Sequence, residues 1–189
     1  MIYVFLADGF EEVEAIAPID ILRRAGFDDV ITVKVGNYLI DWALGSHDIE
    51  ILPDIHENEI DLDNFAGLEM IVLPGGGVGV ENLYNSETVN KIIDYCVAHE
   101  IKIGAICAAP SILARWGYLK DIRATAYPSF RHYLTKGGAI LEEKEKVVTD
   151  GIFTTAAAAG VSIEFGLELV RVLKGEDESK KIGEQILFY

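Results

Sequence analysis

Five short apolar runs alternate with amphipathic segments, and this alternation constrains the fold more than any other feature of the chain. The runs cover residues 2–7, 30–35, 70–75, 101–106 and 152–156. Several are apolar on both faces, which is typical of strands in a parallel sheet that helices cover on both sides. Segments with helical periodicity lie between and after them, at residues 12–26, 86–100, 109–117 and 159–175. The alternation predicts an open α/β sheet with helices on both faces.

Smaller features refine this expectation. Pro18 falls inside the first helical segment, where it either kinks the helix or marks the start of its regular part. Residues 38–52 and 138–150 are predicted to add further β-structure. The charged tail beyond Gly175 is predicted to continue as a surface helix.

Length and charge limit the domain count and the partners. The 189 residues fit one domain, residues 1–189, and half of them are apolar. The 31 acidic and 16 basic residues give a net charge of -15, which repels nucleic-acid backbones and anionic membranes. No apolar stretch approaches the roughly 18 residues of a membrane span. We therefore expect neither nucleic acid nor a membrane as a partner.

The cysteines bear on metal binding and on location. Only Cys96 and Cys107 are present, without a CxxC pair or a Cys/His cluster at zinc spacing. This usage is typical of a reducing cytoplasm, which is the predicted location, and no metal site is expected. Cys96 shares an apolar helix face with Ile92 and Ile93, so we interpret it as structural.

Three unusual stretches follow three of the predicted strands. The acidic turn with Glu11, Glu12 and Glu14 follows residues 2–7, a glycine run begins at Gly75, and Cys107 follows residues 101–106. The carboxyl ends of parallel strands share one edge of such a sheet, and ligands bind there. The three stretches are therefore predicted to meet in a candidate site.

Cys107 has two interpretations. Free cysteines are often inert and buried, which favours simple packing. At a strand-to-helix junction, however, the unpaired N–H groups of the helix favour the thiolate and could hold an oxyanion after the sulfur attacks a carbonyl. The alanines at 108 and 109 leave space beside the sulfur. The stretch is similar to a nucleophile elbow, although G-x-C-x-G is not matched.

Glu14 also has two interpretations. Acids near a helix start complement the helix dipole, and this accounts for much of the acidic turn. Helical phase places Glu14 on the face of Pro18 and Ile21, whereas Glu11 and Glu12 are expected to face solvent. An inward carboxyl beside a thiolate has a raised pKa and can carry a proton near neutral pH.

The remaining polar signals are weaker. The run GGGVGV at residues 75–80 breaks the G-x-G-x-x-G spacing, and no G-K-[ST] follows, so a nucleotide site is not predicted. Close backbone approach to a small substrate explains the run better, with plain turn formation as the alternative. The four histidines are scattered, and each is expected at the surface rather than in catalysis: His47, His56, His99 and His132.

Long motifs in one order resemble a known family. They cover residues 6–26, 72–83, 104–114, 124–130 and 162–170, which together span nearly the whole chain. The chain is similar to the ThiJ/PfpI (DJ-one) superfamily, in the branch that contains the Parkinson-disease-associated protein deglycase.

The resemblance implies a flavodoxin-like three-layer α/β sandwich that forms a homodimer, with the first helix and residues 38–52 as candidate interface. It implies that Cys107 is the reactive cysteine and Glu14 its protonated partner. It further implies that the N–H groups of Gly76 and Ala108 form an oxyanion site, with Gly75 and Tyr127 as further substrate-binding residues. No cofactor is implied.

The chain departs from the family pattern at four places. Ala108 stands where the protease-like branch has histidine, so a Cys-His peptidase lacks its base. Tyr127 stands where many members of the closer branch have histidine, and His47 where that branch often has arginine. Residues 155–161 lack a proline and a charge that the family carries there. These changes bear on substrate preference and on aldehyde activity itself.

Two functions from different classes follow from the resemblance. The first is a cofactor-independent glyoxalase or deglycase that acts on small 2-oxoaldehydes or their adducts, through a Cys107 hemithioacetal with Glu14 as proton shuttle. The second is an oxidative-stress sensor or chaperone-like protein whose Cys107 oxidises. A relative that keeps only the fold is a third alternative, which the intact Glu14 and Cys107 pair disfavours.

Overall fold

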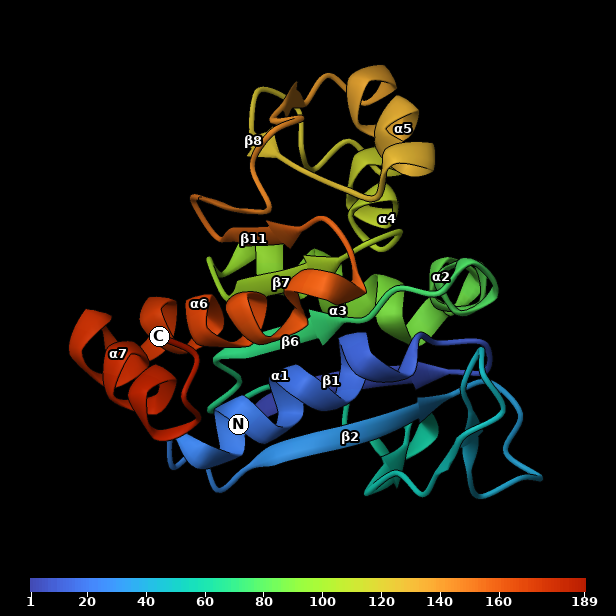
Figure 1. Cartoon of the computed structure of the whole chain (residues 1–189). Coiled ribbons are helices and arrows are strands. Elements are labelled where there is room, and N and C mark those ends of the chain that lie inside the picture. The colour runs from blue at the N-terminus through green and yellow to red at the C-terminus, as the bar shows by residue number, and fades with distance from the viewer.

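A seven-stranded sheet runs through the centre of the computed structural model, which describes residues 1–189 (Figure 1). Its strand order is β10-β11-β7-β6-β1-β2-β5. Every neighbouring pair is parallel except β10 with β11. The strands are β1 (Ile2–Ala7), β2 (Val30–Val35), β5 (Ile55–His56), β6 (Met70–Leu73), β7 (Lys102–Ile106), β10 (Val147–Asp150) and β11 (Phe153–Ala156). The predicted mostly parallel sheet is confirmed.

Helices cover both faces of this sheet. They are α1 (Glu12–Arg24), α2 (Gly77–Asn85), α3 (Glu87–Ala98), α4 (Pro110–Arg115), α5 (Arg131–Lys136), α6 (Ser162–Lys174) and α7 (Glu176–Gln185). Residues of α1 and α6 pack in one core cluster, and residues of α2, α3 and α4 pack in the other. The three layers confirm the flavodoxin-like architecture, and α7 confirms the helix predicted beyond Gly175.

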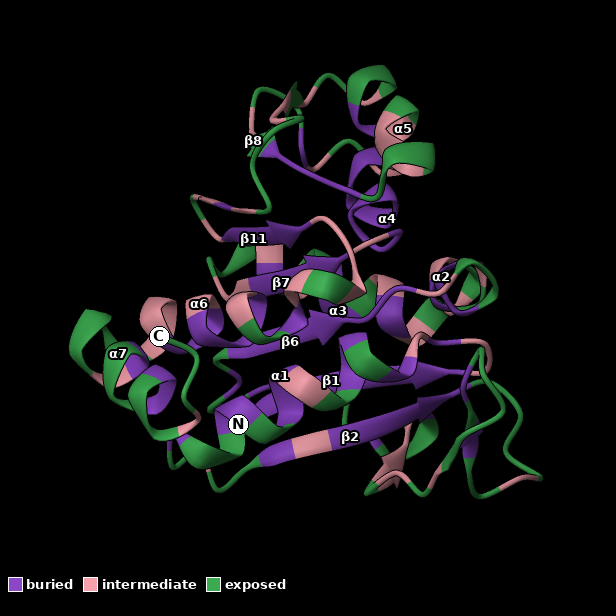
Figure 2. Ribbon diagram, in the orientation of Figure 1, coloured by how far each residue is buried: buried purple, intermediate pink, exposed green.

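The two apolar faces of the central strands follow from this layering. On β1, Tyr3 and Phe5 belong to the cluster with α3, whereas Val4 and Leu6 belong to the cluster with α1 and α6. Side chains alternate across a strand, so a strand covered on both faces must be apolar at every position. All six residues of β1 are buried, and the central strands are the most continuously buried part of the molecule (Figure 2).

Small elements complete the chain. The segment 38–52 holds a hairpin of β3 (Ala43–Leu44) and β4 (Glu50–Ile51), and the second predicted β-segment contains β9 (Ile140–Leu141) and β10. The rest are β8 (Arg123–Ala124) and the 3-10 turns η1 (Glu57–Glu59), η2 (Pro128–Phe130) and η3 (Ala159–Val161). None of the helices is both long enough and apolar enough to cross a bilayer.

Three local expectations need correction. The helix α1 begins at Glu12, so Pro18 does not mark its start. The helix expected over 109–117 covers only Pro110–Arg115. The glycine run, interpreted as a turn or a close approach, also begins the helix α2 at Gly77. Two glycines in the first turn disfavour a helix in isolation, so tertiary packing decides here.

Candidate active site

Cys107 lies at a sharp turn between β7 and α4. Its φ angle is 64°, in the left-handed region that non-glycine residues rarely adopt. Its N–H donates to the carbonyl of Ala156 at 2.8 Å, and its carbonyl accepts from the N–H of Tyr127 at 2.9 Å. These bonds hold the strained backbone from both sides, as in a nucleophile elbow.

Gly75 lies between Cys107 and Glu14. A Cβ atom at Gly75 would lie 2.2 Å from Oε2 of Glu14 and 2.7 Å from Cβ of Cys107. Both distances are far below contact separation, so only glycine permits this arrangement. The Gly75 carbonyl accepts from the N–H of Glu11 at 3.0 Å, which joins the loop to the start of α1. The three stretches therefore meet, as the edge rule predicts.

Glu14 is buried and has one oxygen without a partner. Its side chain lies on the inward face of α1, the residue is 1 % exposed, and Oε2 forms no hydrogen bond of good geometry. Burial raises the pKa of Glu14 to about 7; the Cys107 thiol and the nearby N–H groups of Gly75 and Ala159 lower it, and the charge of Glu11 raises it. The predicted raised pKa is confirmed in direction, and the carboxyl is placed to exchange a proton near neutral pH.

The thiol of Cys107 is harder to ionise than the sequence predicts. Burial raises its pKa to about 12, and the Glu14 carboxylate adds to this, whereas the N–H groups of Ala108 and Gly76 lower it. The prediction of a thiolate favoured by the helix start is wrong while Glu14 is ionised, because burial disfavours a charged sulfur and the adjacent carboxylate repels a second negative charge. Between pH about 7 and about 12 the pair therefore holds one proton and one negative charge.

Two backbone N–H groups face this sulfur. Those of Gly76 and Ala108 lie close enough to lower the pKa of the thiol, whereas the N–H of Ala109 donates to the carbonyl of Ile106. The backbone of Tyr127 adjoins Cys107, and its side chain is 44 % exposed. The arrangement offers a sulfur nucleophile, a proton-carrying acid and two donors for an oxyanion.

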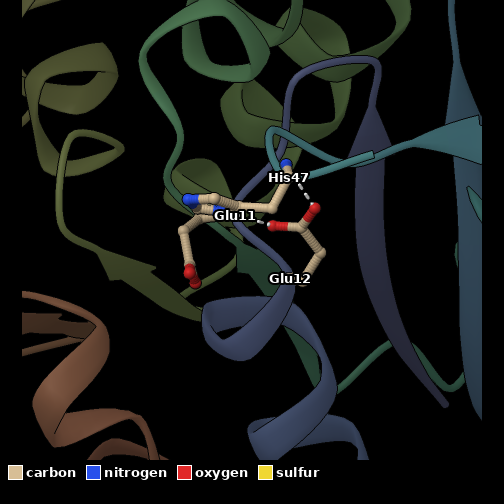
Figure 3. Close-up of side chains that lie close together, drawn as sticks. All are labelled: Glu11, Glu12 and His47. Atoms are coloured by element: carbon tan, nitrogen blue, oxygen red, sulfur yellow. Dashed lines mark hydrogen bonds and ion pairs between the residues drawn. The ribbon is translucent and has the colours of Figure 1, made fainter. Parts of the chain in front are cut away.

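Glu12 differs from its sequence interpretation. It is buried rather than facing solvent, because the loop of the β3–β4 hairpin covers it. The His47 N–H donates to its carboxylate at 2.6 Å, and Nδ1 of His47 lies 2.8 Å from it (Figure 3). Glu11, Glu12 and His47 are also close enough for one ligand atom of each to lie within 4.8 Å of the others. The hydrogen bonds from Ser46 and His47 already satisfy the Glu12 carboxylate without a metal ion. That the protein binds no metal remains a prediction.

The structure brings together all of the predicted site residues around Cys107. Two further contributors were not predicted to act on Glu14: Glu11, which was expected only to face solvent, and Ala159. Glu11 caps α1 by accepting the N–H of Glu14 at 2.8 Å, and its position three residues before Glu14 is a readable capping signal. Ala159 begins η3 shortly after the end of β11 at Ala156, and nothing in its residue type points to Glu14. Cys96 is buried in the core, as predicted.

The fold and the elbow define a class: a flavodoxin-like α/β protein with a cysteine at the carboxyl edge of its sheet. The family model described as the DJ-1/PfpI family matches residues 1–172. The chain belongs to the DJ-1/PfpI family.

Relatives support this assignment over most of the chain. Protein dj-1beta of Drosophila melanogaster is 32% identical over 97% of this chain and 95% of its own length. The glutathione-independent glyoxalase DJ-1 of Schizosaccharomyces pombe is 29% identical over 93% of this chain and 92% of its own. The crystal structure of Drosophila DJ-1beta superposes with a TM-score of 0.90 at 31% identity, covering 98% of this chain and 96% of that one.

Proposed function

We propose that this protein is a cofactor-independent cysteine enzyme that converts small 2-oxoaldehydes, or their early adducts, to 2-hydroxy acids. One observation carries the proposal: a buried acid with a free oxygen and a pKa of about 7 meets a cysteine at an elbow, across a glycine that keeps them close. Relatives named glutathione-independent glyoxalases in Schizosaccharomyces pombe and Caenorhabditis elegans support the same chemistry.

The first step adds the sulfur of Cys107 to the aldehyde carbon. The thiol proton moves to Glu14 as the C–S bond forms, and the N–H groups of Gly76 and Ala108 hold the developing oxyanion. Glu14 then passes this proton to the oxyanion, which gives the hemithioacetal and leaves Glu14 ionised for the next step. The pair suits this step because it holds a single proton between the two groups over the neutral range.

The second step moves hydrogen within the substrate. Glu14 removes the proton from the former aldehyde carbon and returns one to the neighbouring carbon, so the first carbon is oxidised and the second reduced. The product is a 2-hydroxy thioester, which water cleaves to the 2-hydroxy acid and the free thiol. The sum is 2-oxoaldehyde plus water to hydroxy acid, and no external oxidant or reductant is needed.

The test compares the two cysteines and the acid. Cys107→Ala should abolish formation of lactate from methylglyoxal, and Glu14→Gln should reduce it by at least about 10²-fold, with both lactate enantiomers assayed. Cys96→Ala is the matched control, because Cys96 is the other free cysteine and lies in the core away from the elbow. Turnover that persists in Cys107→Ala would contradict the mechanism.

A second candidate function is an oxidation sensor at the same cysteine. The unpartnered Oε2 of Glu14 favours it, because a protonated carboxyl can donate to an oxygen added to the sulfur. A DJ-1 of Toxoplasma gondii, 29% identical with a TM-score of 0.86, is described as oxidized. Mass spectrometry after mild peroxide should show oxygen added at Cys107 but not at Cys96. Selective oxidation without any turnover would favour the sensor over the enzyme.

We also propose that the protein forms a homodimer through α1 and the β3–β4 hairpin. Exposed apolar side chains gather there, with Val13 52 %, Ile16 45 % and Ile49 53 % exposed. They line one groove together with Ile163 of α6 and residues of the C-terminal tail. Sedimentation velocity should show a dimer that Ile16→Glu converts to a monomer. A wild-type monomer at micromolar concentration would reject this interface.

A further inference from the structure

A polar cleft separate from the Cys107 site opens beyond the carboxyl ends of β1 and β2. It has a volume of about 590 Å³, and only two of its eleven lining residues are hydrophobic. Its wall comes from the loops after β1 and β2, from η1, and from the junction of α2 with α3. Three carboxyl groups line it, those of Asp8, Glu57 and Glu87, and no lysine or arginine does.

Glu57 is the most constrained of these acids. It is 5 % exposed, and its carboxylate accepts from the Gly36 N–H at 2.8 Å, the Tyr38 hydroxyl at 3.3 Å and the Ser86 hydroxyl at 2.5 Å. All three donors are neutral, and Glu57 takes part in no ion pair. A buried carboxylate without a cation is uncommon, because loss of hydration is seldom recovered from neutral donors alone.

The cations and dipoles nearby do not neutralise the polar cleft. The buried Lys34 donates to Asp8 at 3.1 Å and to the Trp42 carbonyl at 2.5 Å, so its charge is matched by Asp8. The start of α3, capped by Ser86, supplies about half a positive charge. The two negative charges of Glu57 and Glu87 are larger than this half positive charge, so the cleft has a net negative charge.

We propose that the polar cleft binds a small organic cation, an amine or a guanidinium with a polar chain. A carboxylate has about four acceptor positions, and three donors occupy those of Glu57, which leaves about one for a cationic N–H group. The Asn85 amide, the Thr88 hydroxyl, the Asn82 Oδ1 and the Asn37 Nδ2 also line the cleft and can bind the ligand's other polar groups. The volume suits an organic molecule rather than a bare ion, whose ligands must converge within about 2.6 Å.

Binding can be measured without reference to turnover. Isothermal titration of the full chain with agmatine and putrescine should show saturable binding, whereas succinate and glycerol should not bind. Because the attraction is between charges near the surface, affinity should fall several-fold from about 20 mM to about 200 mM salt.

Two variants locate the binding in this cleft. Glu57→Gln removes the charge and should weaken agmatine binding at least about tenfold. Asn85→Arg places a guanidinium at the exposed rim and should weaken it as much, and it serves as the test if Glu57→Gln does not fold. Glu184→Gln, on the exposed side of α7, removes the same charge elsewhere and should leave binding unchanged.

Several results would overturn the proposal. They are equal binding of succinate or glycerol, binding of Ca²⁺ but of neither amine, absence of any binding at about 10 mM probe, and wild-type affinity in Asn85→Arg. Each is independent of Cys107, so failure here leaves the proposed enzyme activity untouched.

Discussion

Glu12 and Glu14 lie two residues apart in the first turn of α1, and both are buried, yet their pKa values are shifted in opposite directions. The pKa of Glu12 is lowered to about 2, and that of Glu14 is raised to about 7. Both residues expose little surface, 5 % and 1 %, but Glu14 lies deeper in the protein, so burial accounts for part of the difference.

Hydrogen-bond donors add to the effect of burial in separating the pKa values of the two acids. Burial raises the pKa of Glu12, but hydrogen bonds from the His47 side chain and backbone and from the Ser46 hydroxyl outweigh it. Oε2 of Glu14 has no such donor and faces the thiol. Within one helix turn, Glu12 is therefore held in its charged form, where it binds the hairpin, whereas Glu14 can carry a proton near neutral pH.

The first prediction tests whether Glu12 and Glu14 have different roles, by removing the charge of each in turn. Glu14→Gln keeps the shape but cannot shuttle a proton, so kcat/KM for methylglyoxal should fall by about 10²–10⁴. Glu12→Gln should keep activity within about threefold, because Glu12 does not touch the thiol. Equal losses in the two variants would show that the acids act as one unit.

The second prediction concerns folding. Glu12→Gln leaves the donors of Ser46 and His47 with a weaker acceptor and loosens the β3–β4 hairpin from α1, so the free energy of unfolding at pH 7 should fall by about 1–3 kcal/mol. Glu14→Gln should lose less, because Oε2 of Glu14 has no partner to lose. Urea denaturation followed by circular dichroism measures both values. A larger loss in Glu14→Gln would contradict the contrast.

The third prediction is a pair of opposite pH slopes. Between pH about 4.5 and about 2 the unfolded Glu12 binds more proton than the folded one, so its contribution to stability is lost as pH falls. Between pH about 4.5 and about 7 the folded Glu14 binds more proton, so its contribution is lost as pH rises. Each slope is at most about 1.4 kcal/mol per pH unit. Stability curves of Glu12→Gln and Glu14→Gln should each lack one slope; if both variants keep both slopes, other groups are responsible.

The smallest effect is expected at His47. Its side chain is exposed, and the hydrogen bond and charge of Glu12 raise its pKa. In Glu12→Gln the pKa of His47 should fall toward its ordinary value, which proton NMR of the imidazole measures. His47→Gln should reduce stability less than Glu12→Gln, because the backbone N–H of residue 47 still donates to Glu12. An unchanged His47 titration in Glu12→Gln would show that the pair does not form in solution.

Much of the fold was predictable because its signals are local. Apolar runs on both faces identify covered strands, and parallel strands must share their carboxyl edge. That rule alone placed Glu14, Gly75 and Cys107 together. The helix α2 was missed because its cause is not local. A Cβ at Gly79 would lie 2.7 Å from the Phe10 nitrogen, so this glycine, which weakens the helix, also lets it approach the loop after β1.

The two acids show the limit for the site. Helical phase correctly turned Glu14 inward, yet it left Glu12 facing solvent, because the hairpin that buries Glu12 comes from residues about 35 positions later. The thiolate expected at Cys107 failed for a related reason. Burial of the Cys107 sulfur and the nearby charge of Glu14 both raise the pKa of the thiol, and both depend on tertiary packing that no spacing rule contains.

Only the backbone of Gly75 lies between the side chains of Glu14 and Cys107. Every other amino acid would bring a Cβ into space that Glu14 and Cys107 already occupy, so this position has no conservative replacement. In a comparison of related sequences, the residue at position 75 therefore indicates whether the Glu14 and Cys107 arrangement is sterically possible, which the residues at positions 127 and 47 do not. A homologue that keeps the cysteine and the glutamate but has alanine at this position must hold the two side chains farther apart.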